Sequence, residues 1–138
     1  MVHALARVRR HLAPDGTLVL IQPRPLKRPF ISVIAHGRRQ KICALVNPDS
    51  EKRLHAALAA IDTVAANGLF APIGKTDRHF RVRLANPTQL DRYLYSDLRP
   101  PRFPPGGRKR FMHVWKARPR GAKIEVTEFL AVMAMRPT

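Results

Sequence analysis

One stretch of the chain, residues 98–124, combines many cationic residues with aromatic ones and contains no acidic residue. Its cationic and aromatic members are Arg99, Arg102, Phe103, Arg108, Lys109, Arg110, Phe111, Trp115, Lys116, Arg118, Arg120 and Lys123. Cationic side chains bind the phosphates of a nucleic acid, and aromatic rings stack on its bases. The residues of this stretch that we expect to contact a nucleic acid are Arg108, Lys109, Arg110 and Trp115. The i, i+4 spacing of Phe111 and Trp115 equally fits two core residues of a helix whose charges are solvated.

Histidine and tyrosine could accept a proton or line a polar pocket. The candidates are His36, His55, His79, His113, Tyr93 and Tyr95. None of them lies in a catalytic motif, so the sequence identifies no catalytic residue, and a surface or structural role is the simpler interpretation of each. Three residues are candidates for contact with a small substrate: Gln22, which follows an apolar run, His36 and Tyr93.

Other kinds of chemistry find no support in the residue spacing. The six histidines are not grouped as a metal site requires, so we expect no bound metal. No serine lies in a nucleophile elbow, and no phosphate-binding loop is present. Cys43 is the single cysteine and lies in an apolar run, which predicts a buried, unreactive thiol.

The chain has 138 residues, 45% of them hydrophobic, and a formal net charge of +17. This composition predicts a globular domain, and the charge favours polyanions or acidic small molecules as partners. The alternative is that the positive charge is spread over solvated faces and binds no partner. No apolar run approaches the length of a membrane span, and residues 1–11 lack the apolar core of a signal peptide. We therefore expect no membrane contact and a cytoplasmic protein.

The elements that must position these residues begin near the N-terminus. Leu5, Val8 and Leu12 recur with helical spacing, and Pro14-Asp15-Gly16 predicts a turn. The following run, Thr17–Ile21, is apolar without alternation. That pattern predicts a strand buried on both faces, typically a parallel one.

This segment, residues 5–23, resembles the fifth strand unit of class I S-adenosylmethionine-dependent methyltransferases. The resemblance rests on a helix with Arg-Arg, the sequence Leu-x-Pro-x-Gly and the following Leu-Val-Leu. The resemblance implies an α/β fold: the later strands of a partial Rossmann-like methyltransferase sheet, with residues 1–138 as a single partial domain, the C-terminal half. It also implies that the long final strand, Lys123–Met135, lies in the same sheet, antiparallel to a neighbour. The family's glycine-rich cofactor loop and ribose-binding acid have no counterpart in this chain. No cofactor-binding residue is therefore assigned.

The remaining elements follow from periodicity and capping residues. Residues 30–46 predict a β-hairpin insertion around Gly37, and Asn47-Pro48 begins a helix that ends at Asn67-Gly68. Leu69–Ile73 and Arg78–Leu84 predict strands, the second half-exposed, with Phe80, Val82 and Leu84 on one face. Asn86 caps a short helix, and Arg108–Arg118 predicts another. Lys123–Met135 predicts a strand that starts half-exposed and becomes buried on both faces from Phe129.

The resulting functional expectation is the C-terminal portion of a methyltransferase that acts on a small molecule and is inactive alone. S-adenosylmethionine is the cofactor of the family, and we expect this chain by itself to bind it weakly or not at all. An unpaired strand edge at residues 17–21 predicts self-association or pairing with a missing N-terminal half. Two alternatives stay open: a small basic nucleic-acid-binding protein, and a structural subunit that completes a sheet with another chain.

Overall fold

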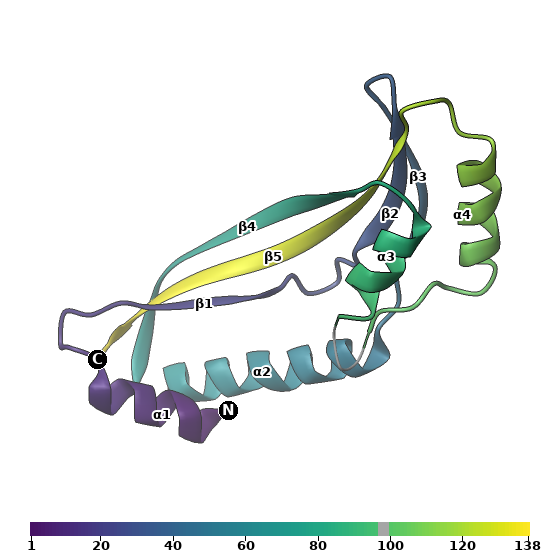
Figure 1. Ribbon diagram of the computed structural model, residues 1–138. Coiled ribbons are helices and arrows are strands. Elements are labelled where there is room, and N and C mark those ends of the chain that lie inside the picture. The colour runs from purple at the N-terminus through teal and green to yellow at the C-terminus, as the bar shows by residue number, and fades with distance from the viewer. Residues whose placement is uncertain (97–99) are drawn as a thin grey trace. The chain divides into compact units, whose positions relative to one another are not determined.

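The computed structural model describes residues 1–96 and 100–138, and within them the chain forms four helices and five strands. In chain order they are α1 (Val2–His11), β1 (Leu18–Pro23), β2 (Phe30–Ala35), β3 (Arg38–Ala44), α2 (Pro48–Ala66), β4 (Phe70–Leu84), α3 (Pro87–Leu94), α4 (Gly107–Lys116) and β5 (Lys123–Pro137). The strands form one open antiparallel sheet of order β1-β5-β2-β3, with β4 also paired to β5 (Figure 1). The predicted α/β class is confirmed, but the sheet is antiparallel, so the expected Rossmann-like methyltransferase sheet is not confirmed.

The chain divides into two compact units, and β4 and β5 contribute residues to both. Unit 1 consists of Met1–Pro25, Ser50–Arg78 and Leu130–Thr138. Unit 2 consists of Leu26–Asp49 and His79–Phe129. Unit 1 therefore contains α1, β1 and nearly all of α2, whereas unit 2 contains the β2–β3 hairpin, α3 and α4.

The core of unit 1 lies between α1, α2 and one face of the sheet. Its buried side chains are Leu5 of α1, Ile61 and Val64 of α2, Phe70 of β4 and Met135 of β5. The predicted helix after Asn47-Pro48 is confirmed as α2, and its residues in this core are Ile61 and Val64, with Ala65 packed against them. Fixing α2 in this way also fixes where β4 begins.

β1 is exposed on one face, so the prediction that residues 17–21 are buried on both faces of a parallel strand was wrong. β1 pairs antiparallel with β5, with Leu20 opposite Met133. Leu20 packs into the core, whereas Val19 and Ile21 are 53% and 65% exposed. The physical reason is that α1 and α2 cover only one face here, and apolar composition does not report whether a second layer is present. The prediction that residues 17–21, 80–84 and 123–135 share one sheet is confirmed, as is the antiparallel direction of the last strand.

The predicted hairpin is confirmed as β2 and β3, joined by the two-residue turn His36-Gly37. Both turn residues have positive φ, 50° and 72°, as a type I′ hairpin turn requires. β2 also pairs with β5, from Phe30 opposite Thr127 to Ile34 opposite Lys123. The hairpin thus extends the sheet and leaves β3 as its terminal strand.

α3 and α4 pack on one face of the sheet in unit 2. Leu90 of α3 and Phe111 of α4 are fully buried against Ile31, Ile124 and Val126 of the strands. Both helices were predicted. The Asn86 side chain caps α3 as expected, because its oxygen accepts a hydrogen bond of 2.9 Å from the amide of Gln89. The opposite face of β2 and β5 in unit 2 is therefore the one without these helices.

The two long strands differ from their predicted form. β4 is one continuous strand through residues 70–84, where two shorter strands were expected. In β5 the predicted order of burial is reversed: residues 124–127 are buried on both faces, and residues 128–130 are only half-buried. The reason is that Glu125, predicted to be exposed, lies beneath arginine side chains from neighbouring strands.

Among the described residues, none of the helices has the length and apolar character that a membrane span needs.

Candidate functional site

A groove lies between β3 and α4 in unit 2. It consists of two adjoining cavities of about 450 Å³ and 950 Å³, which share Gln40, His113 and Val114. The smaller cavity is further lined by Lys41, Ile42, Lys109 and Arg110. The larger one adds Val33, Ala35, His36, Arg38, Arg39, Ala117, Arg118 and Pro119. These volumes lie in the range of small-molecule sites.

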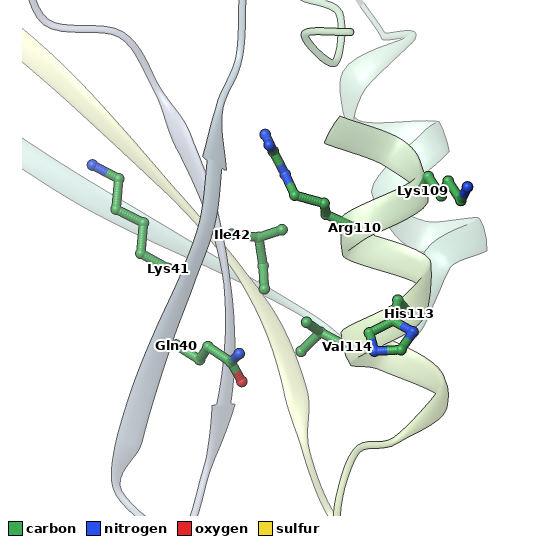
Figure 2. Close-up of a pocket in the computed structure, with 7 residues that line it drawn as sticks. All are labelled: Gln40, Lys41, Ile42, Lys109, Arg110, His113 and Val114. Carbon is green, nitrogen blue, oxygen red and sulfur yellow. The ribbon is translucent and has the colours of Figure 1, made fainter. Parts of the chain in front are cut away.

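The smaller cavity has an apolar floor and polar edges (Figure 2). Ile42 of β3 and Val114 of α4 face each other, with Gln40 beside them and the Arg110 guanidinium directed toward the strand. Lys41 points to the other side of β3, and Lys109 points away from it on α4. Arg110 is therefore the cation of this cavity that points inward, although three cationic residues line it.

Strand alternation and helical periodicity explain this arrangement. Gln40 and Ile42 are two residues apart on a strand and share one face, while Lys41 takes the other. Arg110 and Val114 are four residues apart on a helix and also share a face. The close approach of α4 to β3 depends on Gly107. A Cβ there would lie 2.7 Å from Cδ of Pro104 and 3.3 Å from Sγ of Cys43.

The groove is electrostatically one-sided, since none of the residues that line its two cavities is acidic. Its larger cavity includes Arg38 and Arg118, of which Arg118 also lies 3.9 Å over the ring of Trp115, while Arg39, which also lines it, directs its guanidinium to Glu125. Cys43, next to the smaller cavity, is buried, as predicted, and burial raises the pKa of its thiol despite the nearby charge of Arg110. The arrangement suits an anionic molecule with an apolar body.

The three predicted substrate-contact residues lie in three different segments of the two units. Gln22 is a half-buried residue of β1 in unit 1. His36, in the hairpin turn of unit 2, lines the larger cavity. Tyr93 of α3 donates a hydrogen bond of 3.0 Å from its hydroxyl to Oε1 of Glu128. Burial and the neighbouring carboxylate raise the pKa of Tyr93, which keeps the phenol protonated.

The four predicted nucleic-acid contacts all lie on α4 but have different surroundings. Arg108 forms a two-pronged ion pair with Asp91, at 2.8 and 3.0 Å, and this hydrogen bonding lowers the pKa of Asp91. Lys109 and Arg110 line the groove, and the side chain of Trp115 is buried against Phe111. Arg99 lies outside the described residues. The remaining histidine candidates, His55 and His79, are exposed, as expected.

Sequence reasoning missed a second cluster, which is built around Glu125. Its carboxylate is completely buried and faces three arginines: Arg39 at 2.6 Å, Arg81 at 3.7 Å and Arg83 at 3.5 Å. The only signal for it in the sequence is an acidic residue inside an apolar strand. Its partners come from β3 and β4, far away along the chain.

Two observations on the described residues concern a metal site and the glycine pair Gly106–Gly107. No group of three or more histidine, cysteine, aspartate or glutamate residues among them could hold a metal ion. The glycine pair 106–107 opens α4, but the space beside Gly107 is filled by Pro104 and Cys43 rather than left for a ligand.

Comparisons of the chain with family models, curated proteins and solved structures gave no match.

Proposed function

We propose that this chain forms the C-terminal portion of an S-adenosylmethionine-dependent methyltransferase that acts on a small anionic molecule. The observation that carries the proposal is that β1 is incompletely paired and covered on one face only. Among the described strands it pairs only with β5, and its Val19 and Ile21 side chains are exposed on the face opposite α1 and α2. In a doubly wound sheet such a strand has neighbours on both edges and helices on both faces. The remaining strands and helices would cover this edge and this face.

The position of β5 gives further support. It pairs with β1, β2 and β4, so the final strand lies in the sheet beside three earlier ones. The resemblance of residues 5–23 implies an antiparallel final strand in a sheet of otherwise parallel strands; the direction of β5 fits this, whereas the rest of the sheet is antiparallel as well. The cofactor would be held by a part of the enzyme outside this chain, because the family's glycine-rich loop has no counterpart in these 138 residues.

The groove of unit 2 is the candidate site for the methyl acceptor. Ile42 and Val114 would contact an apolar body, and Arg110 would pair with an anionic group. His36 and His113 line the larger cavity and are the groove residues that could accept a proton from the acceptor. The contribution of the groove is to position the acceptor.

The DNA upstream of the Met1 codon provides the test of the methyltransferase assignment. We expect an in-frame continuation that encodes a glycine-rich loop. The longer product should bind S-adenosylmethionine in calorimetry with a low-micromolar Kd, about −8 kcal/mol, and the 138-residue chain should bind it far more weakly. An upstream frame without such a loop, or a longer product without affinity, would overturn the assignment.

Binding to the groove is tested separately with 1-naphthoate, an aromatic carboxylate, followed by NMR on the 138-residue chain. Arg110→Gln should weaken binding about tenfold, the effect of losing one charge-assisted hydrogen bond. Lys109→Gln is the matched control, because it removes the same charge from the adjacent position but from a side chain directed away from β3. Equal losses in the two variants would mean that general charge, not the groove, attracts the ligand.

A second candidate function, nucleic-acid binding, is favoured by the outer surface of α4. Arg108, Lys109 and Lys116 are exposed there, while Phe111 and Trp115 face the core. This surface can contact phosphates, but its aromatic rings are not available for stacking on bases. Fluorescence anisotropy with a single-stranded RNA should then show affinity that falls steeply with salt, and reversal of Lys109 and Lys116 to glutamate should abolish it. Lack of binding at low salt would exclude this function.

A further inference from the structure

The Glu125 cluster concentrates positive charge on the face of the unit 2 sheet that α3 and α4 leave uncovered. Cross-strand pairing places Lys41, Ser32 and Glu125 side by side, and Arg39, Ile34 and Lys123 in the next row. Arg81 and Arg83 reach the same carboxylate from β4. One buried carboxylate therefore faces three guanidinium groups, and two lysines lie in the rows beside it.

The three arginines approach Glu125 in a particular way. The closest approach of each arginine to Glu125 is made by its Nε atom, to Oε1 from Arg39 and Arg81 and to Oε2 from Arg83. The terminal Nη groups are therefore the donors of these side chains that a ligand could reach. The side chains are 37%, 44% and 70% exposed, so these donors are accessible to solvent. Glu125 orders three guanidinium groups without neutralising them.

Two buried hydroxyls next to the carboxylate provide a second observation. Within the described part of the chain, Ser32 Oγ and Thr127 Oγ1 make no hydrogen bond although both residues are almost completely buried, and Oε2 of Glu125 between them makes none either. Buried hydroxyls are usually paired, and a ligand is one way to satisfy them. Ser32 lies directly opposite Glu125, and Thr127 lies two residues further along the same face.

We propose that this arginine cluster binds a phosphate group of a small phosphorylated molecule. A guanidinium matches two phosphate oxygens at once, and several of them around one dianion are a common solution for phosphate recognition. The aromatic side chains of Phe30 and Phe129, 5.9 Å apart, continue the same face beyond Thr127. A nucleoside monophosphate is therefore a suitable probe alongside an inorganic one. The inference does not depend on the proposed methyltransferase function, which uses the groove on the other face of β3.

The test is calorimetric titration of the 138-residue chain with inorganic pyrophosphate and, separately, with AMP. We expect both to bind, and Arg83→Gln and Arg81→Gln each to weaken binding about tenfold. Arg81→Lys, which keeps the charge but loses the fork, should fall between wild type and Arg81→Gln. Arg110→Gln, in the groove, is the control and should leave both affinities unchanged.

The possible failures are distinguishable. Arg83 is the most exposed of the three arginines, so its variant is expected to keep the fold, which a thermal melt of each variant verifies. Lack of binding of both probes at millimolar concentration would overturn the proposal. So would binding that Arg110→Gln weakens as much as Arg83→Gln does, or binding of a single-stranded oligonucleotide by a chain that binds neither small probe.

Discussion

Glu125 and Glu128 lie three residues apart on β5, on opposite faces, and their environments shift their pKa values in opposite directions. Burial alone would raise the pKa of Glu125, but the hydrogen bond from Arg39 and the charges of Arg39 and Arg81 outweigh it and lower the pKa. For Glu128 burial prevails over the hydrogen bond from Tyr93, so the pKa is raised. Two carboxyls of one strand should therefore contribute to stability with opposite pH dependence.

For Glu125 we predict that Glu125→Gln lowers the free energy of unfolding at neutral pH. The folded-state pKa lies below the unfolded value, so the stabilisation is present above the unfolded pKa and disappears as the pH falls through the folded pKa. Urea denaturation at neutral pH and below about pH 4 measures this difference. It should shrink in acid, where wild-type Glu125 is itself becoming protonated. A difference that stays constant with pH would contradict the ion-pair explanation.

For Glu128 the sign is reversed. Its folded-state pKa is raised, so the stability linked to its protonation is present below the unfolded pKa and is lost as the pH rises through the folded pKa. We predict that Glu128→Gln raises the free energy of unfolding at neutral pH, since an amide keeps the acceptor for the Tyr93 hydroxyl without the buried charge. The same denaturation series measures it. A destabilised variant at neutral pH would show that the charged form is the one the fold prefers.

At the scale of elements, the contact between α4 and β3 depends on a missing side chain. We predict that Gly107→Ala destabilises unit 2 by about 1–3 kcal/mol, the usual cost of overpacking, because the new Cβ would meet the rigid ring of Pro104. Gly74→Ala is the control: its Cβ would have no neighbour within 4 Å, so its melting temperature should stay close to wild type. Equal melting temperatures for the two variants would mean that α4 shifts without cost.

Most elements were predictable because their signals are local. Caps at Asn47-Pro48 and Asn86 mark two helix starts, and Gly37 marks the hairpin. Burial was less predictable, since an apolar strand looks the same whether one face or two are covered, as β1 shows. Gly74 did not interrupt β4, because pairing with β5 overrides a weak local preference.

The candidate site was predicted only in part, for a related reason. Lys109 and Arg110 follow from the density of charge around α4, but the half of the groove that β3 supplies depends on tertiary packing. Trp115 was an open choice between stacking platform and core, and its position one turn after Phe111 decided it for the core. The Glu125 cluster joins three strands that are far apart in sequence, so no local pattern reveals it.

At the scale of the whole molecule, the two units differ in what they expose. Unit 2 carries the groove and the arginine cluster, and most of the chain's excess positive charge lies in its residues. Unit 1 exposes apolar residues on β1, which is one of the two end strands in the order β1-β5-β2-β3. Unpaired backbone groups beside exposed apolar side chains are a template for another strand. When two chains meet, the net positive charge therefore opposes association and the exposed edge of β1 favours it.

We predict that the chain is monomeric at low salt and forms dimers or soluble aggregates at moderate salt. Repulsion from the net charge of +17 acts over a range of only about 8 Å at physiological ionic strength, and strand edges meet at shorter distances. Analytical ultracentrifugation at two ionic strengths measures the effect. Ile21→Lys, on the exposed face of β1, should keep the chain monomeric at both, whereas Lys52→Gln on α2 should not, because it leaves β1 intact. A wild-type monomer at both salt concentrations, with a sharp cooperative melt, would mean that β1 is a stable edge that needs no partner. The proposal of a missing half-domain would then fail with it.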